Sequence, residues 1–70
     1  MTNVNMLKSV MAANGDCNFV ADIAELLNLS RTTASNKLNG KADFKQSEIA
    51  IIAERYKLKA DDIKQIFIGT

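Results

Sequence analysis

The chain has 70 residues and a net charge of +1, with no histidine, proline or tryptophan and a single cysteine, Cys17. These counts exclude a zinc site of the Cys/His kind, a histidine-dependent catalytic triad and an intramolecular disulfide. The length predicts one small domain, 1–70, with a modest core, because short chains bury a smaller share of their surface. The net charge is low for a nucleic-acid binder.

Targeting and catalytic signals are absent from the sequence. No basic segment followed by an apolar stretch opens the chain, and the longest apolar run, residues 49–53, is far shorter than the roughly 20 residues of a membrane span. We therefore expect a soluble, cytoplasmic protein without a membrane partner. Because there is also no glycine-rich phosphate loop and no clustered carboxylates, we expect neither an enzyme nor a metal or cofactor site.

Two Asn-Gly pairs, Asn14-Gly15 and Asn39-Gly40, divide the chain. Such a pair is typical either of a hairpin turn or of a helix end with glycine in the left-handed conformation. Periodicity decides between them, since the apolar residues before Gly15 recur at helical spacing, as Val4, Leu7, Val10 and Met11. Ala34 and Leu38, before the second pair, are likewise four apart. Both pairs therefore indicate helix ends.

The pattern predicts an all-α fold of five short helices. They run from Asn3 or Val4 to Asn14, from Phe19 to Asn28, from Arg31 to Asn39, from Gln46 to Tyr56, and from about Ala60 onward. The expected N-caps are Thr2 or Asn3, then Asn18 and Ser30. For the fourth helix Asp43 is expected, because Lys45, three residues before Glu48, stands where a capping box has Ser or Thr. Leu29 and Leu58 are expected to fill the turns after the second and fourth helices. The end of the chain, 67–70, is expected to be a short extended tail.

The segment 19–39 has the pattern of a helix-turn-helix, whose second helix lies in the DNA major groove. Ala24 is small where two helices would approach closely, and Asn28 tolerates the left-handed turn. The outer face of the second helix carries no acidic residue, and its polar residues are Arg31, Thr32, Thr33, Ser35, Asn36 and Lys37. Side chains of these types can contact bases. The alternative is a solvated or protein-binding face, although such a face usually mixes Glu with Lys.

Residues 20–40 resemble the helix-turn-helix of lambda-repressor-like regulators, of the Xre/Cro/CI type. The continuation 41–49 and the ending 62–67 resemble small phage repressors of Gram-positive hosts, so the resemblance covers roughly residues 6–68. It implies a five-helix DNA-binding domain that acts as a transcriptional regulator. It also implies a homodimer on a palindromic operator of double-stranded DNA.

By position, the resemblance assigns operator contacts to Ser30, Arg31, Thr32, Thr33 and Asn36, with Ser35 and Lys37 on the same helix. It assigns phosphate contacts to the following segment, through Asn39, Gly40 and Lys41, and we add Lys45. The chain departs from the family at Val20, where the family usually has a phosphate-binding Gln. It also has Asn28 in place of the turn glycine, and the segment from Gly15 to Ala24 is about two residues longer.

The charge is unevenly distributed, which bears on the partner. Residues 1–29 carry −2, residues 30–45 carry +3 and residues 46–70 are neutral. The positive segment coincides with the expected DNA-facing surface. We expect dimerisation through the apolar ending Ile66, Phe67 and Ile68. The alternative function is a protein-binding helix-turn-helix module that modulates another phage regulator without binding DNA, which the low net charge and Val20 favour.

Overall fold

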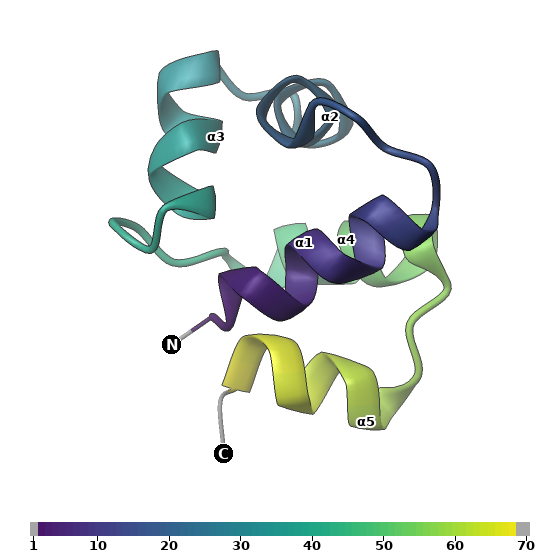
Figure 1. The fold of residues 1–70 in the computed structure, drawn as a ribbon. Helices are drawn as coiled ribbons and strands as arrows, with labels where there is room; N and C mark the ends of the chain where they lie inside the picture. Colours follow the sequence, from purple (N-terminus) through teal and green to yellow (C-terminus); the bar gives the residue numbers. More distant parts are fainter. Residues whose placement is uncertain (1, 69–70) are drawn as a thin grey trace.

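The computed structural model describes residues 2–68, and within that range the chain is all-helical, with five helices and no strand (Figure 1). The helices are α1 (Val4–Ala13), α2 (Phe19–Leu27), α3 (Arg31–Leu38), α4 (Gln46–Tyr56) and α5 (Ala60–Ile63). A π-helical turn, η1 (Lys64–Ile68), continues α5 directly. The expected all-α fold class is therefore confirmed at this level.

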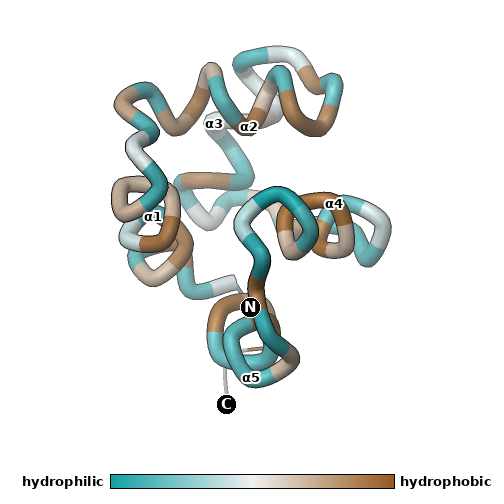
Figure 2. The backbone as a smooth tube through the Cα atoms, turned by 90° about the vertical axis from the view of Figure 1, so that its right-hand side faces the viewer, coloured by the Kyte–Doolittle hydropathy of each residue, from teal (hydrophilic) through white to brown (hydrophobic). Residues whose placement is uncertain are grey.

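The helices form three levels, which Figures 1 and 2 show from two directions. α2 and α3 pack against each other on one side, α1 and α4 lie in the middle, and α5 with η1 lies on the opposite side. The radius of gyration of 10.8 Å is close to the roughly 11 Å expected for a compact chain of this length. None of the described helices is long and apolar enough to cross a membrane.

Asparagine and serine caps begin the first three helices, as the sequence predicts. The side-chain oxygen of Asn3 accepts a hydrogen bond from the N–H of Met6 at 3.1 Å, and Asn18 caps α2 in the same way. Ser30 Oγ accepts from the N–H of Thr33 at 3.2 Å. Each cap satisfies one of the N–H groups that a helix start leaves without a backbone partner.

Left-handed residues end the helices where the sequence predicts a stop. Gly15 and Gly40 follow α1 and α3 with φ of +89° and +79°, and Asn28 ends α2 with φ of +55°. Beyond Asn28, the N–H of Leu29 donates to the carbonyl of Ala24 at 2.8 Å, which is the bond of a Schellman motif. α4 ends in the same conformation at residue 57, which the sequence analysis did not foresee because that residue is a lysine.

The core lies between the three levels, and every helix of residues 4–56 contributes to it. Brown and teal segments alternate along the helices in Figure 2, as expected for amphipathic helices around one core. The largest side chains that are fully buried are Leu7, Met11, Ile23, Leu38, Ile52 and Ile66. Three of them, Leu7, Met11 and Leu38, are among the apolar residues whose helical spacing is noted in the sequence.

The C-terminal segment differs from the prediction. Residues 67 and 68 belong to η1 and are not extended, and residues 69–70 of the expected tail lie outside the described residues. Ile66 and Phe67 are buried, with exposed fractions of 1% and 6%. The ring of Phe67 packs edge-on against that of Phe44, with centroids 5.7 Å apart. The N–H of Asn3 donates to the carbonyl of Ile66, so the segment is tied to the start of α1.

Candidate nucleic-acid interface

α3 is presented on the surface by a short connection from α2. Ala34 and Leu38 of α3 are buried, and Ala24 of α2 has no side chain beyond its Cβ to keep the two helices apart. Ser30 fixes the first turn of α3 twice, because its hydroxyl accepts from the N–H of Thr33 and donates to Thr33 Oγ1 at 2.9 Å. The opposite side of α3 therefore faces solvent.

The predicted contact residues fall into three groups by exposure. The exposed ones are Ser30, Arg31, Thr32, Asn39, Gly40, Lys41 and Lys45, the half-buried ones are Thr33, Ser35 and Asn36, and Lys37 is buried. Several polar groups of this set are already bonded within the protein, such as the amide of Asn39, which donates to Ser35 Oγ at 3.2 Å. Within residues 2–68, the side chains of Arg31, Thr32, Lys41 and Lys45 have no hydrogen bond or ion pair.

Lys37 does not lie on the exposed face of α3, contrary to the prediction. Only 6% of the residue is exposed, and its ammonium lies 2.7 Å from Oε1 of Glu48 and 3.1 Å from the carbonyl oxygen of Asp43. The ammonium also lies 5.7 Å from the centroid of the Phe44 ring. The reason is helical spacing, since Lys37 lies between Ala34 and Leu38 on the inward face. The same spacing could have identified it from the sequence.

Glu48 is the residue that the sequence analysis missed. Its Oε1 accepts from Lys37 and also from the backbone N–H of Lys45 at 2.8 Å. The N-cap of α4 is therefore Lys45, held by Glu48 three residues later, and not Asp43 as expected. Burial acts to raise the pKa of Glu48, but the hydrogen bonds from Lys37 and Lys45 and their positive charges outweigh it, and the pKa lies below its ordinary value. The carboxylate is therefore ionised and its charge is matched by the ammonium of Lys37.

The backbone amides after α3 are not free to bind phosphate, contrary to the expectation for the segment around Gly40. The N–H of Gly40 donates to the carbonyl of Lys37 at 3.3 Å, and the N–H groups of Lys41 and Ala42 both donate to the carbonyl of Asn36. These bonds fold the connection back on the last turn of α3. The groups of this segment that could bind an anion are the exposed ammonium groups of Lys41 and Lys45. Gly40 has no side chain that would obstruct the approach of the anion.

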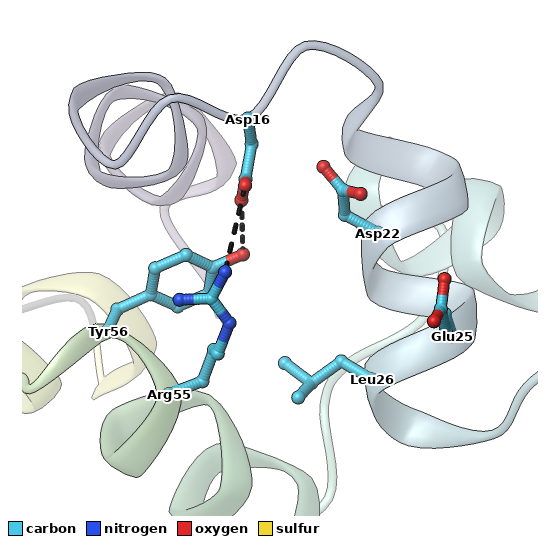
Figure 3. Close-up of a pocket in the computed structure, with 6 residues that line it drawn as sticks. All are labelled: Asp16, Asp22, Glu25, Leu26, Arg55 and Tyr56. Carbon is cyan, nitrogen blue, oxygen red and sulfur yellow. Dashed lines mark hydrogen bonds and ion pairs between the residues drawn. The ribbon is translucent and has the colours of Figure 1, made fainter.

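An acidic cavity of about 210 Å³ lies between α2, α4 and the connection before α2 (Figure 3). Asp16, Asp22, Glu25, Leu26, Arg55 and Tyr56 line it. The hydroxyl of Tyr56 donates to Asp16, and the Arg55 guanidinium lies 5.0 Å from the centre of the Tyr56 ring and 4.0 Å from the same carboxylate. Burial and this carboxylate raise the pKa of Tyr56. Among the described residues, no group of three or more His, Cys, Asp or Glu is arranged to hold a metal ion.

The predicted dimer surface is largely internal. Ile66 and Phe67 are core residues and are not available to a second copy, because packing against Phe44 and the start of α1 already covers them. Ile68 alone of the three predicted residues is exposed, at 58%. The other large apolar side chain exposed in the described part of the chain is Ile51, on α4.

A scan against protein-family models, a search of curated proteins and a search of solved structures find no match to this chain.

Proposed function

We propose that this chain is a sequence-specific DNA-binding regulator of the lambda-repressor-like type, whose α3 enters the major groove. The observation that carries the proposal is the free polar surface at the start of α3. Arg31 and Thr32 are exposed and form no bond within residues 2–68, and no acidic residue occurs between Ser30 and Ala42. A guanidinium can read guanine, and a threonine methyl can contact a thymine methyl.

The connection between α3 and α4 supplies the phosphate contacts in this proposal. The charge of Lys37 is compensated by Glu48 and is therefore not counted. The remaining charges of the segment 30–45 are those of Arg31, Lys41 and Lys45, which are positive, and Asp43, which is negative, so the local charge is +2. This charge is smaller than the +3 expected from the sequence. Affinity then depends more on base contacts and on the number of copies bound than on general attraction to DNA.

Two copies are needed for tight binding in this proposal. One copy offers few phosphate contacts, and repressors with a helix-turn-helix commonly place two recognition helices about 34 Å apart, one turn of the double helix. A palindromic site would then be recognised by a homodimer. Ile66 and Phe67 play no part in its interface, because both are buried in the core.

The decisive experiment is repeated selection of bound sequences from a pool of random DNA duplexes. The proposal predicts enrichment of a palindrome whose half-sites are about one helical turn apart. Titration of the enriched duplex should then give an affinity that falls steeply with salt, because each neutralised phosphate releases counterions. A pool that stays random after selection, with no salt-dependent binding to any duplex, would refute DNA binding.

A second candidate is a protein-binding module that modulates another phage regulator without contacting DNA. Two observations favour it. Lys37 is withdrawn from the surface by Glu48, and Val20 packs against the core and offers no phosphate anchor at the start of α2. Measuring complex formation with a candidate partner repressor, alongside the selection from random duplexes, distinguishes the two. A tight protein complex together with an unenriched pool supports the module.

A further inference from the structure

The connection from α3 to α4, residues 39–45, has no regular secondary structure, yet it carries the two exposed ammonium groups of Lys41 and Lys45. Neither ammonium is bonded within residues 2–68. In an irregular segment the position of such side chains depends on what holds the backbone. The placement of both charges therefore depends on the bonds between this connection and the two helices.

The connection is held at both ends. At the α3 end, the N–H groups of Lys41 and Ala42 donate to the carbonyl of Asn36, at 2.9 and 3.3 Å. At the α4 end, Glu48 accepts from the N–H of Lys45 at 2.8 Å. The ammonium of Lys37 joins the two ends, since it contacts both Oε1 of Glu48 and the carbonyl of Asp43.

Both members of this pair are buried side chains, with 7% and 10% of the Lys37 and Glu48 side chains exposed. A buried pair of charges holds a fixed geometry because separation would leave an uncompensated charge in the interior. A pair of apolar side chains could fill the same space. It could not, however, bond the Asp43 carbonyl or the Lys45 N–H.

We infer that Lys37 and Glu48 are positioning residues for DNA binding: they fix the connection 39–45 so that Lys41 and Lys45 are held beside α3 where the phosphates of one groove edge pass. The inference rests on the proposed function. It assigns Lys37, which was expected to contact DNA, a role through the main chain of the connection.

The test needs a folded protein that lacks the pair. Lys37→Met together with Glu48→Leu replaces both charges by apolar side chains of similar size, a change that often leaves stability unaltered or raised. If this variant does not fold, Lys37→Met with Glu48→Gln keeps an acceptor for the Lys45 N–H and removes only the bonds of the ammonium. Circular dichroism and urea unfolding show which variant is folded.

The first measurement is amide hydrogen exchange of the free protein. In the variant with Glu48→Leu, we expect the Lys41, Ala42 and Lys45 amides to lose protection relative to the unaltered chain. In the variant with Glu48→Gln, which keeps the acceptor for the Lys45 N–H, we expect the loss at Lys41 and Ala42. The Leu29 and Leu58 amides, which close the ends of α2 and α4 by equivalent bonds to Ala24 and Ala53, are the control and should keep theirs. Protection that is unchanged at positions 41 and 42, in whichever variant is folded, would overturn the inference.

The second measurement is the salt dependence of binding to a mixed-sequence duplex of about two helical turns. Lys41→Ala should lower the slope of log affinity against log salt by about 1 in the unaltered chain. In the double variant the slope should already be lower, and adding Lys41→Ala should change it little. A full Lys41 effect in both backgrounds would overturn the inference and show that the pair serves stability alone.

The two measurements separate failure of the inference from failure of the proposed function. If the double variant binds the duplex with the same salt dependence as the unaltered chain, the inference is overturned, but the proposed function is not. If the unaltered chain binds neither this duplex nor any duplex of the random pool at any salt concentration, the proposed function is refuted and so is the role of the pair in DNA binding. Exchange at positions 41, 42 and 45 then still decides whether the pair holds the connection.

Discussion

Tyr56, the last residue of α4, donates its hydroxyl hydrogen to a carboxylate oxygen of Asp16, 40 residues earlier in the chain. The bond joins α4 to the connection between α1 and α2, at one side of the acidic cavity shown in Figure 3. Both partners are largely buried, with 7% of Tyr56 and 11% of the Asp16 side chain exposed. A hydrogen bond to a charged group in such a place contributes more than one at the surface.

Tyr56→Phe removes this bond and keeps the ring. We expect the free energy of unfolding to fall by about 1.5–3 kcal/mol, the usual range for hydrogen bonds to charged groups. Arg55→Gln is the matched control, because the Arg55 side chain is half exposed and 4.0 Å from Asp16, and such a pair contributes less than about 1 kcal/mol. Urea unfolding of both variants measures the difference. Equal losses of unfolding free energy in the two variants would contradict the expectation that the Tyr56–Asp16 hydrogen bond contributes more than the Arg55–Asp16 ion pair.

Tyr56 should also resist ionisation in the folded protein. Burial and the Asp16 carboxylate raise its pKa above the ordinary value of 10.0, so the folded state keeps the phenolic proton that the unfolded state loses. The stabilisation is thus complete below about pH 10 and is lost as the pH rises further. Because Tyr56 is the only tyrosine, phenolate absorbance in an alkaline titration reports this group alone. If the Tyr56 phenol ionises at the same pH in the native protein and in the urea-unfolded protein, this expectation is wrong.

The sequence predicts the fold class well because local signals agree with the packing. The Asn3, Asn18 and Ser30 caps and the helix end at Asn28 depend on a few neighbouring residues, and all four are confirmed. The Asn-Gly pairs were ambiguous as turn signals alone, and the helical spacing of the apolar residues before them resolved the choice correctly. Such features need no knowledge of the rest of the chain.

The incorrect predictions concern side chains whose burial depends on contacts with residues distant in the sequence. Lys37 was placed on the outer face of α3 with the contact residues beside it, although its spacing from Ala34 and Leu38 places it inward. The carboxylate of Glu48, from the next helix, compensates its buried charge. Ile66 and Phe67 were expected to form a dimer surface, but the Phe44 ring and the start of α1 cover them. Spacing alone could have placed Lys37 inward, but neither its pairing with Glu48 nor the packing of Phe67 on Phe44 can be inferred from local sequence.

The register of α4 can be tested with two neighbouring isoleucines. Ile52 is fully buried, whereas Ile51 is 42% exposed. We expect Ile52→Ala to lower the free energy of unfolding by about 2–5 kcal/mol, because it leaves a cavity in the core. Ile51→Ala removes the same atoms from a largely solvated site and should cost much less. Comparable losses in urea unfolding would mean that α4 is rotated from the orientation described.

Glu48 should make the protein sensitive to acid. Its pKa is lower in the folded state than the ordinary value of 4.5, so its stabilisation is present above that pH and is lost as the pH falls through the folded value. Glu48→Gln should therefore reduce the loss of stability on acidification. Glu54→Gln, at an exposed position of the same helix, is the control and should follow the unaltered chain. Urea midpoints measured between neutral and acidic pH test this, and identical pH profiles of the two variants would contradict it.

Arg31 is the most direct test of the proposed base contacts. Its side chain is exposed at the first position of α3 and unbonded within residues 2–68, so Arg31→Ala should leave the helical circular dichroism unchanged. If Arg31 contacts a guanine, the affinity for the selected duplex should fall about tenfold or more, and discrimination at one base pair should weaken. Lys64→Ala removes an exposed positive charge from η1, at the opposite side of the molecule from α3, and should leave affinity and discrimination nearly unchanged (Figure 1). Equal losses of affinity in the two variants would show that charge alone, and not the face of α3, determines binding.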